Sequence, residues 1–107
     1  MIYDVNKKDT IGLANTEPKL LEQEPPLYQI VLHNDDFTPM EFVLGVLEKF
    51  FFFERRIAAE IMLLAHTQGK AGFGNFSKDY AETKVSQVID YARSHEHPLI
   101  CSMEVAS

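Results

Sequence analysis

The chain has 107 residues, of which 46% are hydrophobic, and both values are typical of one small globular domain. The net charge of −6 argues against a nucleic-acid-binding protein, which usually carries a basic surface. No apolar run reaches the roughly 18–20 residues that span a membrane, and the lone Cys101 excludes an internal disulfide. The first residues lack the pattern of a signal peptide, so we expect none. We therefore expect a cytoplasmic protein that binds neither nucleic acid nor membranes.

Residues 1–25 are predicted to form a flexible N-terminal extension. The segment lacks apolar periodicity, and Pro18, Pro25 and Pro26 interrupt any helix there. It serves either as a chain end without a role or as an arm that reaches a partner. Residues 26–107 form the predicted core domain.

The first strand and the first helix of the core frame a polar bend. Leu27–His33 is rich in β-branched and aromatic residues, which predicts a strand. Asn34–Asp36 follow it, and such side chains favour turns because they hydrogen-bond to their own backbone. A helix is predicted next, with Thr38 as its N-cap, Pro39 in its first position and Glu41 completing a Thr-x-x-Glu capping box.

The rest of the chain continues this pattern of short elements. The four phenylalanines at 50–53 are too apolar for a solvated loop, so we expect them to form the helix end and a buried corner. The order of elements predicts an α+β fold, with a small three-stranded, largely antiparallel sheet and three helices packed on one face (β-α-α-β-α-β). The remaining predicted elements are a helix over about 54–66 ended by Gly69, a strand over 70–76, a helix over 78–94 capped by Ser77, and a strand over 99–105.

Residues capable of chemistry are sparse, and each has a simple structural explanation. The Asp35-Asp36 pair suits a turn, although it could also form an acid/base or metal site. His66 suits the negative end of a helix dipole. Cys101 lies on a predicted buried strand, where a thiol is not activated, and His95 and His97 lack further metal ligands nearby in the sequence. We expect no metal and no cofactor.

Four segments of the core carry a resemblance when they are taken together. They are Asn34–Val43 (NDDFTPMEFV), Met62–Ala71 (MLLAHTQGKA), Ala81–Val85 (AETKV) and Glu96–Leu99 (EHPL). In order and spacing they resemble the motifs of the ClpS family, the bacterial adaptors of the N-end rule pathway. The similarity covers about residues 26–105.

The resemblance implies an adaptor and not an enzyme. Family members bind the free N-terminus of proteins that begin with Leu, Phe, Tyr or Trp. They deliver these proteins to the ClpA unfoldase of the ClpAP protease and modulate its choice of substrates. His66 must then present an unprotonated ring nitrogen to the bound amine, so binding is expected to weaken in acid. The implied amine-binding residues are Asn34, Asp35, Asp36 and His66.

The resemblance also implies an apolar pocket for the first side chain and a separate docking surface. Met40 resembles the gatekeeper that disfavours β-branched first residues. Docking to the unfoldase is expected around the third predicted helix, and the protein is expected to be monomeric when free. The implied pocket residues are Thr38, Met40, Val43, Met62, Ala65 and Leu99, and the implied docking residues are Asp79, Glu82 and Lys84.

One pocket position departs from the family pattern. The family commonly has Val immediately before the histidine, and this chain has Ala65. The missing methyl groups predict a roomier pocket that favours Trp and holds Leu less tightly. Phe37, where Tyr is frequent, is a milder change that should leave the acceptors alone.

Two other interpretations remain open at this point. One is an enzyme that acts on a bound amine or metal through Asp35, Asp36 and His66, although no nucleophile accompanies them. The other is a regulator of the unfoldase that reads no N-terminal residue.

Overall fold

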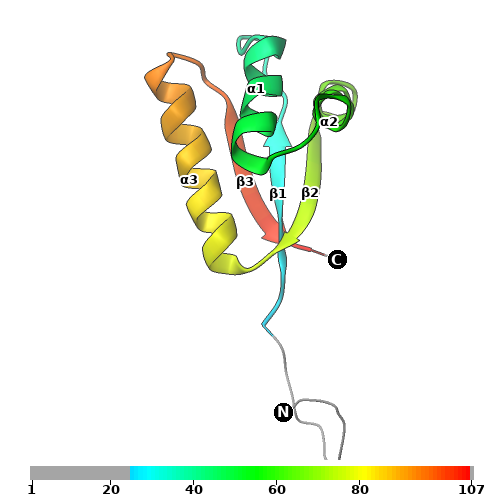
Figure 1. The fold of residues 1–107 in the computed structure, drawn as a ribbon, viewed down its shortest axis with the longest axis vertical. Helices are drawn as coiled ribbons and strands as arrows, with labels where there is room; N and C mark the ends of the chain where they lie inside the picture. The colour runs from blue at the N-terminus through cyan, green and yellow to red at the C-terminus, as the bar shows by residue number, and fades with distance from the viewer. Residues whose placement is uncertain (1–24, 107) are drawn as a thin grey trace, which may run out of the picture.

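The computed structural model describes residues 25–106 and contains the predicted α+β fold (Figure 1). The order of elements is the predicted one, so the fold class is confirmed. The predicted N-terminal extension, residues 1–25, lies outside the described residues except for Pro25. The elements are β1 Tyr28–His33, α1 Met40–Phe51, α2 Arg55–Gln68, β2 Lys70–Phe76, α3 Lys78–Ser94 and β3 Ile100–Val105.

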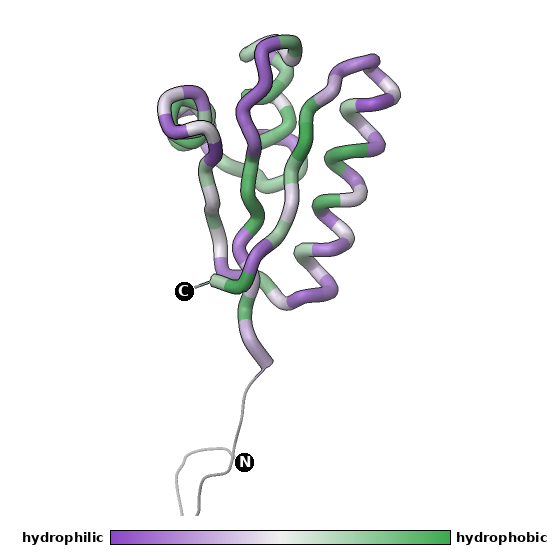
Figure 2. Tube along the Cα trace, turned by 180° about the vertical axis from the view of Figure 1, so that it is seen from behind, coloured by the Kyte–Doolittle hydropathy of each residue, from purple (hydrophilic) through white to green (hydrophobic). Residues whose placement is uncertain are grey.

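The sheet has the order β2-β1-β3, and both of its pairings are antiparallel. The central strand β1 is its most buried part, with Ile30, Val31 and Leu32 at most 3% exposed. The three helices cover one face of the sheet, whereas the view from behind shows the strands without a helix over them (Figures 1 and 2). His33, the last residue of β1, lies opposite both Lys70 and Ile100. The loop after β1 therefore leaves the sheet between the starts of β2 and β3.

The core lies between this sheet and the helices. Val46 and Leu47 from α1 are each 1% exposed. Burial of such a side chain stabilises the fold by about 1.5–3 kcal/mol. Small side chains allow the other two helices to approach closely, because Ala58 of α2 and both Ala81 and Ala92 of α3 are fully buried. None of the helices described between residues 25 and 106 has the length and hydropathy needed to cross a membrane.

The predicted capping box at the start of α1 is wrong. Pro39 is the N-cap rather than the first helical residue, with φ −62° and ψ 144°, and no side chain caps the helix. The Glu41 carboxylate instead accepts hydrogen bonds from Arg55 at the start of α2, at 2.7 Å. The physical reason is that Asp35 already binds the backbone amide of Thr38, which fixes the chain one turn earlier.

The predicted buried corner at 50–53 is only partly correct. Helix α1 ends at Phe51, and Phe52 adopts the left-handed conformation with φ 60° and remains 80% exposed. Its neighbours do pack inward, since the rings of Phe51 and Phe53 lie 4.9 and 5.3 Å from the ring of Phe73 on β2. The chain must reverse between α1 and α2, and the residue that makes this reversal points outward.

The ends of α2 and α3 confirm their sequence signals. Gly69 has φ 91° and its amide donates to the carbonyl of Ala65, so it ends α2 as predicted, although the helix extends to Gln68. The Ser77 hydroxyl accepts a hydrogen bond from the amide of Tyr80 at 3.2 Å and caps α3. These two ends determine where His66 and the docking candidates of α3 lie.

Candidate functional site

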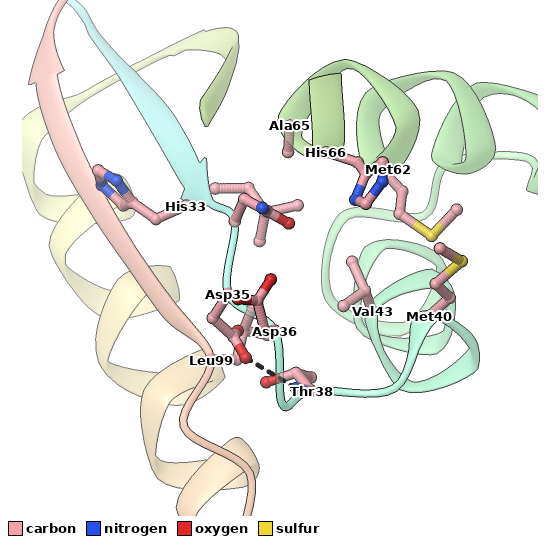
Figure 3. Close-up of a pocket in the computed structure, with 12 residues that line it drawn as sticks. His33, Asp35, Asp36, Thr38, Met40, Val43, Met62, Ala65, His66 and Leu99 are labelled. Carbon is pink, nitrogen blue, oxygen red and sulfur yellow. Dashed lines mark hydrogen bonds between the residues drawn. The ribbon is translucent and has the colours of Figure 1, made fainter. Parts of the chain in front are cut away.

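A short loop after β1 carries three acceptor-bearing side chains. Asp35 organises this loop, because its Oδ1 atom accepts a hydrogen bond from the amide of Phe37 at 2.8 Å. The same atom accepts one from the amide of Thr38 at 2.7 Å (Figure 3). The amide of Asn34 donates to the carbonyl of Gly69 at 3.0 Å, which ties the loop to the C-terminal end of α2. The side chains of Asn34 and Asp36 remain exposed at the surface.

The hydrogen bonds within the loop keep Asp35 ionised. Partial burial of its carboxyl group raises the pKa, but the amides of Phe37 and Thr38, the Thr38 side chain and the nearby His97 ring together lower it by more. The pKa of Asp35 therefore lies below its ordinary value of 3.8. The loop thus carries negative charge at every pH at which the protein is expected to work.

His66 approaches the same loop from the last turn of α2. It is exposed, and its ring points toward the space between α2 and the acceptor loop (Figure 3). The hydrogen bond between Asn34 and Gly69 holds the loop close to the end of α2 that carries His66, since Gly69 follows His66 by three residues. Acceptors from two elements that are far apart in the sequence therefore converge on one volume.

A cavity of about 240 Å³ has these acceptors on one side and apolar side chains on the other. The start of α1 supplies Met40 and Val43, and the facing side of α2 supplies Met62 and Ala65, with the two methionines pointing toward one another (Figure 3). Exposure falls from 55% at Met40 to 3% at Ala65 and 1% at Leu99. Met40 therefore lies at the mouth of the cavity and Leu99 at its inner end.

All ten residues predicted for the amine and pocket sites line this single cavity. Sequence reasoning missed two further lining residues, Leu32 and His33. The His33 ring points away from the cavity and its Nε2 atom hydrogen-bonds with the Ser102 hydroxyl at 2.8 Å, so it contributes through its backbone (Figure 3). Their position directly before Asn34, at the end of the predicted strand, was the signal available.

The Thr38 side chain lines the cavity, as predicted for a pocket residue, but it does not form the predicted helix cap. Its hydroxyl group is buried and forms no well-aligned hydrogen bond within residues 25–106, although the Thr38 side chain lies near enough to Asp35 to help lower the pKa of that carboxyl group. It lines the cavity together with Val43 and Leu99. The residue thus belongs to the wall of the site and not to a helix cap.

The predicted docking residues lie on α3, away from the cavity. Asp79 and Glu82 are exposed. Lys84 is half-buried, and its Nζ atom lies 5.9 Å from the ring centre of Phe52 and 5.6 Å from that of Tyr80. The start of α3 lies at the opposite end of the sheet from the loop that follows β1 (Figure 1). The two candidate surfaces are therefore spatially separate.

The other potentially reactive side chains, Cys101, His95 and His97, do not form a catalytic arrangement. Cys101 is 4% exposed, and burial raises the pKa of its thiol to about 11, so the thiol remains protonated. The His97 ring packs edge-on against Phe42 at 4.4 Å, and His95 bonds to the carbonyl of Tyr91. Within residues 25–106, no three His, Cys, Asp or Glu side chains gather where they could hold a metal ion.

Comparison with known proteins shows which family the chain resembles. Residues 23–102 match the profile of the family described as ATP-dependent Clp protease adaptor protein ClpS. A curated ATP-dependent Clp protease adapter protein ClpS from Roseobacter denitrificans is 56% identical over 96 residues, which cover 90% of this chain and 83% of that protein. A solved structure of Agrobacterium tumefaciens ClpS2 bound to L-phenylalaninamide superposes with a TM-score of 0.75. It is 35% identical, and the match covers 78% of this chain and all of that one.

Proposed function

Because the chain belongs to the ClpS family, the adaptors of the ATP-dependent Clp protease, we propose that its cavity receives the free N-terminus of substrate proteins that begin with Leu, Phe, Tyr or Trp. It is an adaptor and not an enzyme. The proposal extends to delivery: the bound protein passes to the ClpA unfoldase of ClpAP, and the adaptor thereby changes which substrates ClpA degrades. The proposed setting is the cytoplasm, where the free thiol of Cys101 stays reduced.

The observation that carries this proposal is the contact between an acidic acceptor cluster and an apolar cavity. L-Phenylalaninamide, the molecule bound to Agrobacterium tumefaciens ClpS2, joins a free α-amine to a phenyl ring. A ligand of this kind needs acceptors and a cavity side by side. The residues around the cavity of this chain provide both.

The amine half of the ligand determines the roles proposed for the acceptors. An N-terminal ammonium group has three donors and a positive charge, so it binds best where several acceptors converge. One oxygen of Asp35 already accepts two amides, which leaves its second oxygen and its charge for the ligand. Asn34, Asp36 and His66 supply the remaining acceptors, with an unprotonated ring nitrogen on His66.

The first side chain of the ligand occupies the apolar half. The whole cavity of about 240 Å³, acceptor side included, is below the roughly 300–1,000 Å³ of sites for drug-sized molecules, which suits one terminal residue. Met62 and Met40 have flexible side chains that adapt to rings and to branched chains alike. Met40, at the mouth, narrows the entrance close to the ligand backbone and so disfavours Ile and Val, which branch at Cβ.

Docking and delivery involve other parts of the chain. We assign docking on the unfoldase to Asp79, Glu82 and Lys84 of α3, since their distance from the cavity leaves the substrate site free. Residues 1–25 are the segment proposed to engage the unfoldase pore. The adaptor acts as a monomer when free.

A fluorescent peptide that begins with Phe tests the proposal. We expect saturable binding that is lost when the same peptide is N-acetylated, because acetylation removes the ammonium charge. Asp36→Asn should weaken binding, whereas Asp90→Asn, an exposed acid on α3, serves as a control of equal charge change. A protein that docks on ClpA but binds neither form of the peptide would instead be a regulator that reads no N-terminal residue.

A further inference from the structure

The connection between α3 and β3 forms part of the site although it is neither helix nor strand. Its last residue, Leu99, closes the inner end of the cavity and is 1% exposed. His97, two residues earlier, packs against Phe42 of α1 at 4.4 Å and lies close enough to lower the pKa of Asp35. The connection therefore contacts both the apolar half and the amine half of the site.

Arg93, in the last turn of α3, holds this connection in place. Its Nη1 atom donates to the carbonyl of His97 at 2.8 Å and to the carbonyl of Leu99 at 3.0 Å. Hydrogen bonds from a charged donor are stronger than those between neutral groups. One guanidinium nitrogen thus fixes two carbonyls on either side of Pro98.

The backbone around Leu99 offers little else to hold it. Pro98 has no N–H group to donate, and the strand pairing with β1 begins only at Ile100. Just before this stretch, Glu96 has φ 62°, and the His97 amide returns to the carbonyl of Ala92. The Leu99 side chain is held by packing in the core, whereas the hydrogen bonds that fix its backbone come from Arg93.

We propose that Arg93 is a positioning residue for recognition of the first side chain, acting through Leu99. The inference rests on the proposed function of the cavity. Leu99 lies at the inner end, so a long side chain such as that of Phe or Trp reaches it, whereas Leu is shorter. Loss of the Arg93 bonds loosens the inner wall and weakens binding of aromatic first residues more than binding of Leu.

The direction in which Kd changes when Arg93 is replaced distinguishes a positioning role from an electrostatic one. A positive charge near an ammonium-binding site opposes ligand binding, so removal of the Arg93 charge alone would tighten binding of every peptide. Positioning predicts the opposite sign and a dependence on the first residue. Loss of fold stability without a change at the cavity would alter thermal unfolding but leave the ranking of first residues unchanged.

The experiment compares Arg93→Met with Arg93→Lys and with the control Arg56→Met. Arg56 is an exposed arginine on α2, paired with Glu60, so its replacement removes the same charge elsewhere. Peptides that differ only in a first Phe, Trp or Leu are titrated by fluorescence anisotropy, and thermal unfolding checks that each variant is folded. If Arg93→Met does not fold, Arg93→Gln takes its place under the same criteria.

We expect Arg93→Met to raise the Kd of the Phe and Trp peptides about fivefold or more, and that of the Leu peptide less than about twofold. Arg93→Lys, which retains a charged donor, should recover most of the affinity, and Arg56→Met should change little. Equal changes for all three peptides, tighter binding or no change would each overturn the inference. If the wild-type protein fails to distinguish the Phe peptide from its N-acetylated form, the proposed function itself fails.

Discussion

Restoring two methyl groups at residue 65 should shift the preference of the cavity from Trp toward Leu. Ala65 lies on α2, is 3% exposed and lines the cavity, at the position where the family pattern has Val. Each buried methyl group contributes about 0.8 kcal/mol. Ala65→Val should therefore strengthen the binding of a ligand that fills the cavity only partly by about 1.6 kcal/mol. That amount corresponds to roughly tenfold in Kd.

The two ligands should respond in opposite directions. A Leu side chain leaves part of the cavity of about 240 Å³ empty, so the added methyl groups contact it and its Kd falls by up to roughly tenfold. A Trp side chain needs the space that Val occupies, and overpacking costs about 1–3 kcal/mol. The ratio of the two dissociation constants should therefore change by more than about tenfold.

Fluorescence anisotropy with peptides that differ only in the first residue measures this ratio. Ala59→Val is the matched control, because Ala59 lies on the same helix but does not line the cavity, so it carries the same loss of helix propensity. Thermal unfolding of both variants reports any general distortion. A Leu-to-Trp ratio that Ala65→Val leaves unchanged, or an equal loss for both peptides, would refute the reasoning.

Two further predictions concern the acceptor loop. Thr38→Val replaces a buried hydroxyl that caps no helix and lacks a well-aligned hydrogen bond, so the free energy of unfolding in urea should stay the same or rise; a loss of about 1 kcal/mol, the usual effect of a lost cap, would support the capping role instead. Asp35→Asn keeps an acceptor oxygen but removes the charge. Since the pKa of Asp35 is lowered in the folded state, ionised Asp35 stabilises the fold above its ordinary pKa of 3.8 and loses this effect as the pH falls through the lower folded value. Urea denaturation should therefore show the variant less stable than wild type near about pH 6 and closer to it below about pH 3; a gap that widens in acid would contradict this.

Local signals in the sequence determined the order and most bounds of the elements. Ser77 and Gly69 act through hydrogen bonds and backbone angles within a few residues, so their roles could be read from the chain alone and the structure confirms them. The strand over 70–76 and the helix over 78–94 have their predicted bounds. The choice of site residues came from a resemblance to a family, because no periodicity identifies a binding residue.

Only the tertiary structure decided how these parts meet. Asp35 takes the backbone amide of Thr38 that the predicted capping box assigned to Glu41, in a loop whose amide at Asn34 is tied to Gly69, far away in the sequence. The Arg93 side chain likewise donates a hydrogen bond to the carbonyl of Leu99, a contact that no pattern of hydrophobic residues reveals. Sequence patterns report interactions between near neighbours, whereas a binding cavity is made by contacts between segments that only folding brings together.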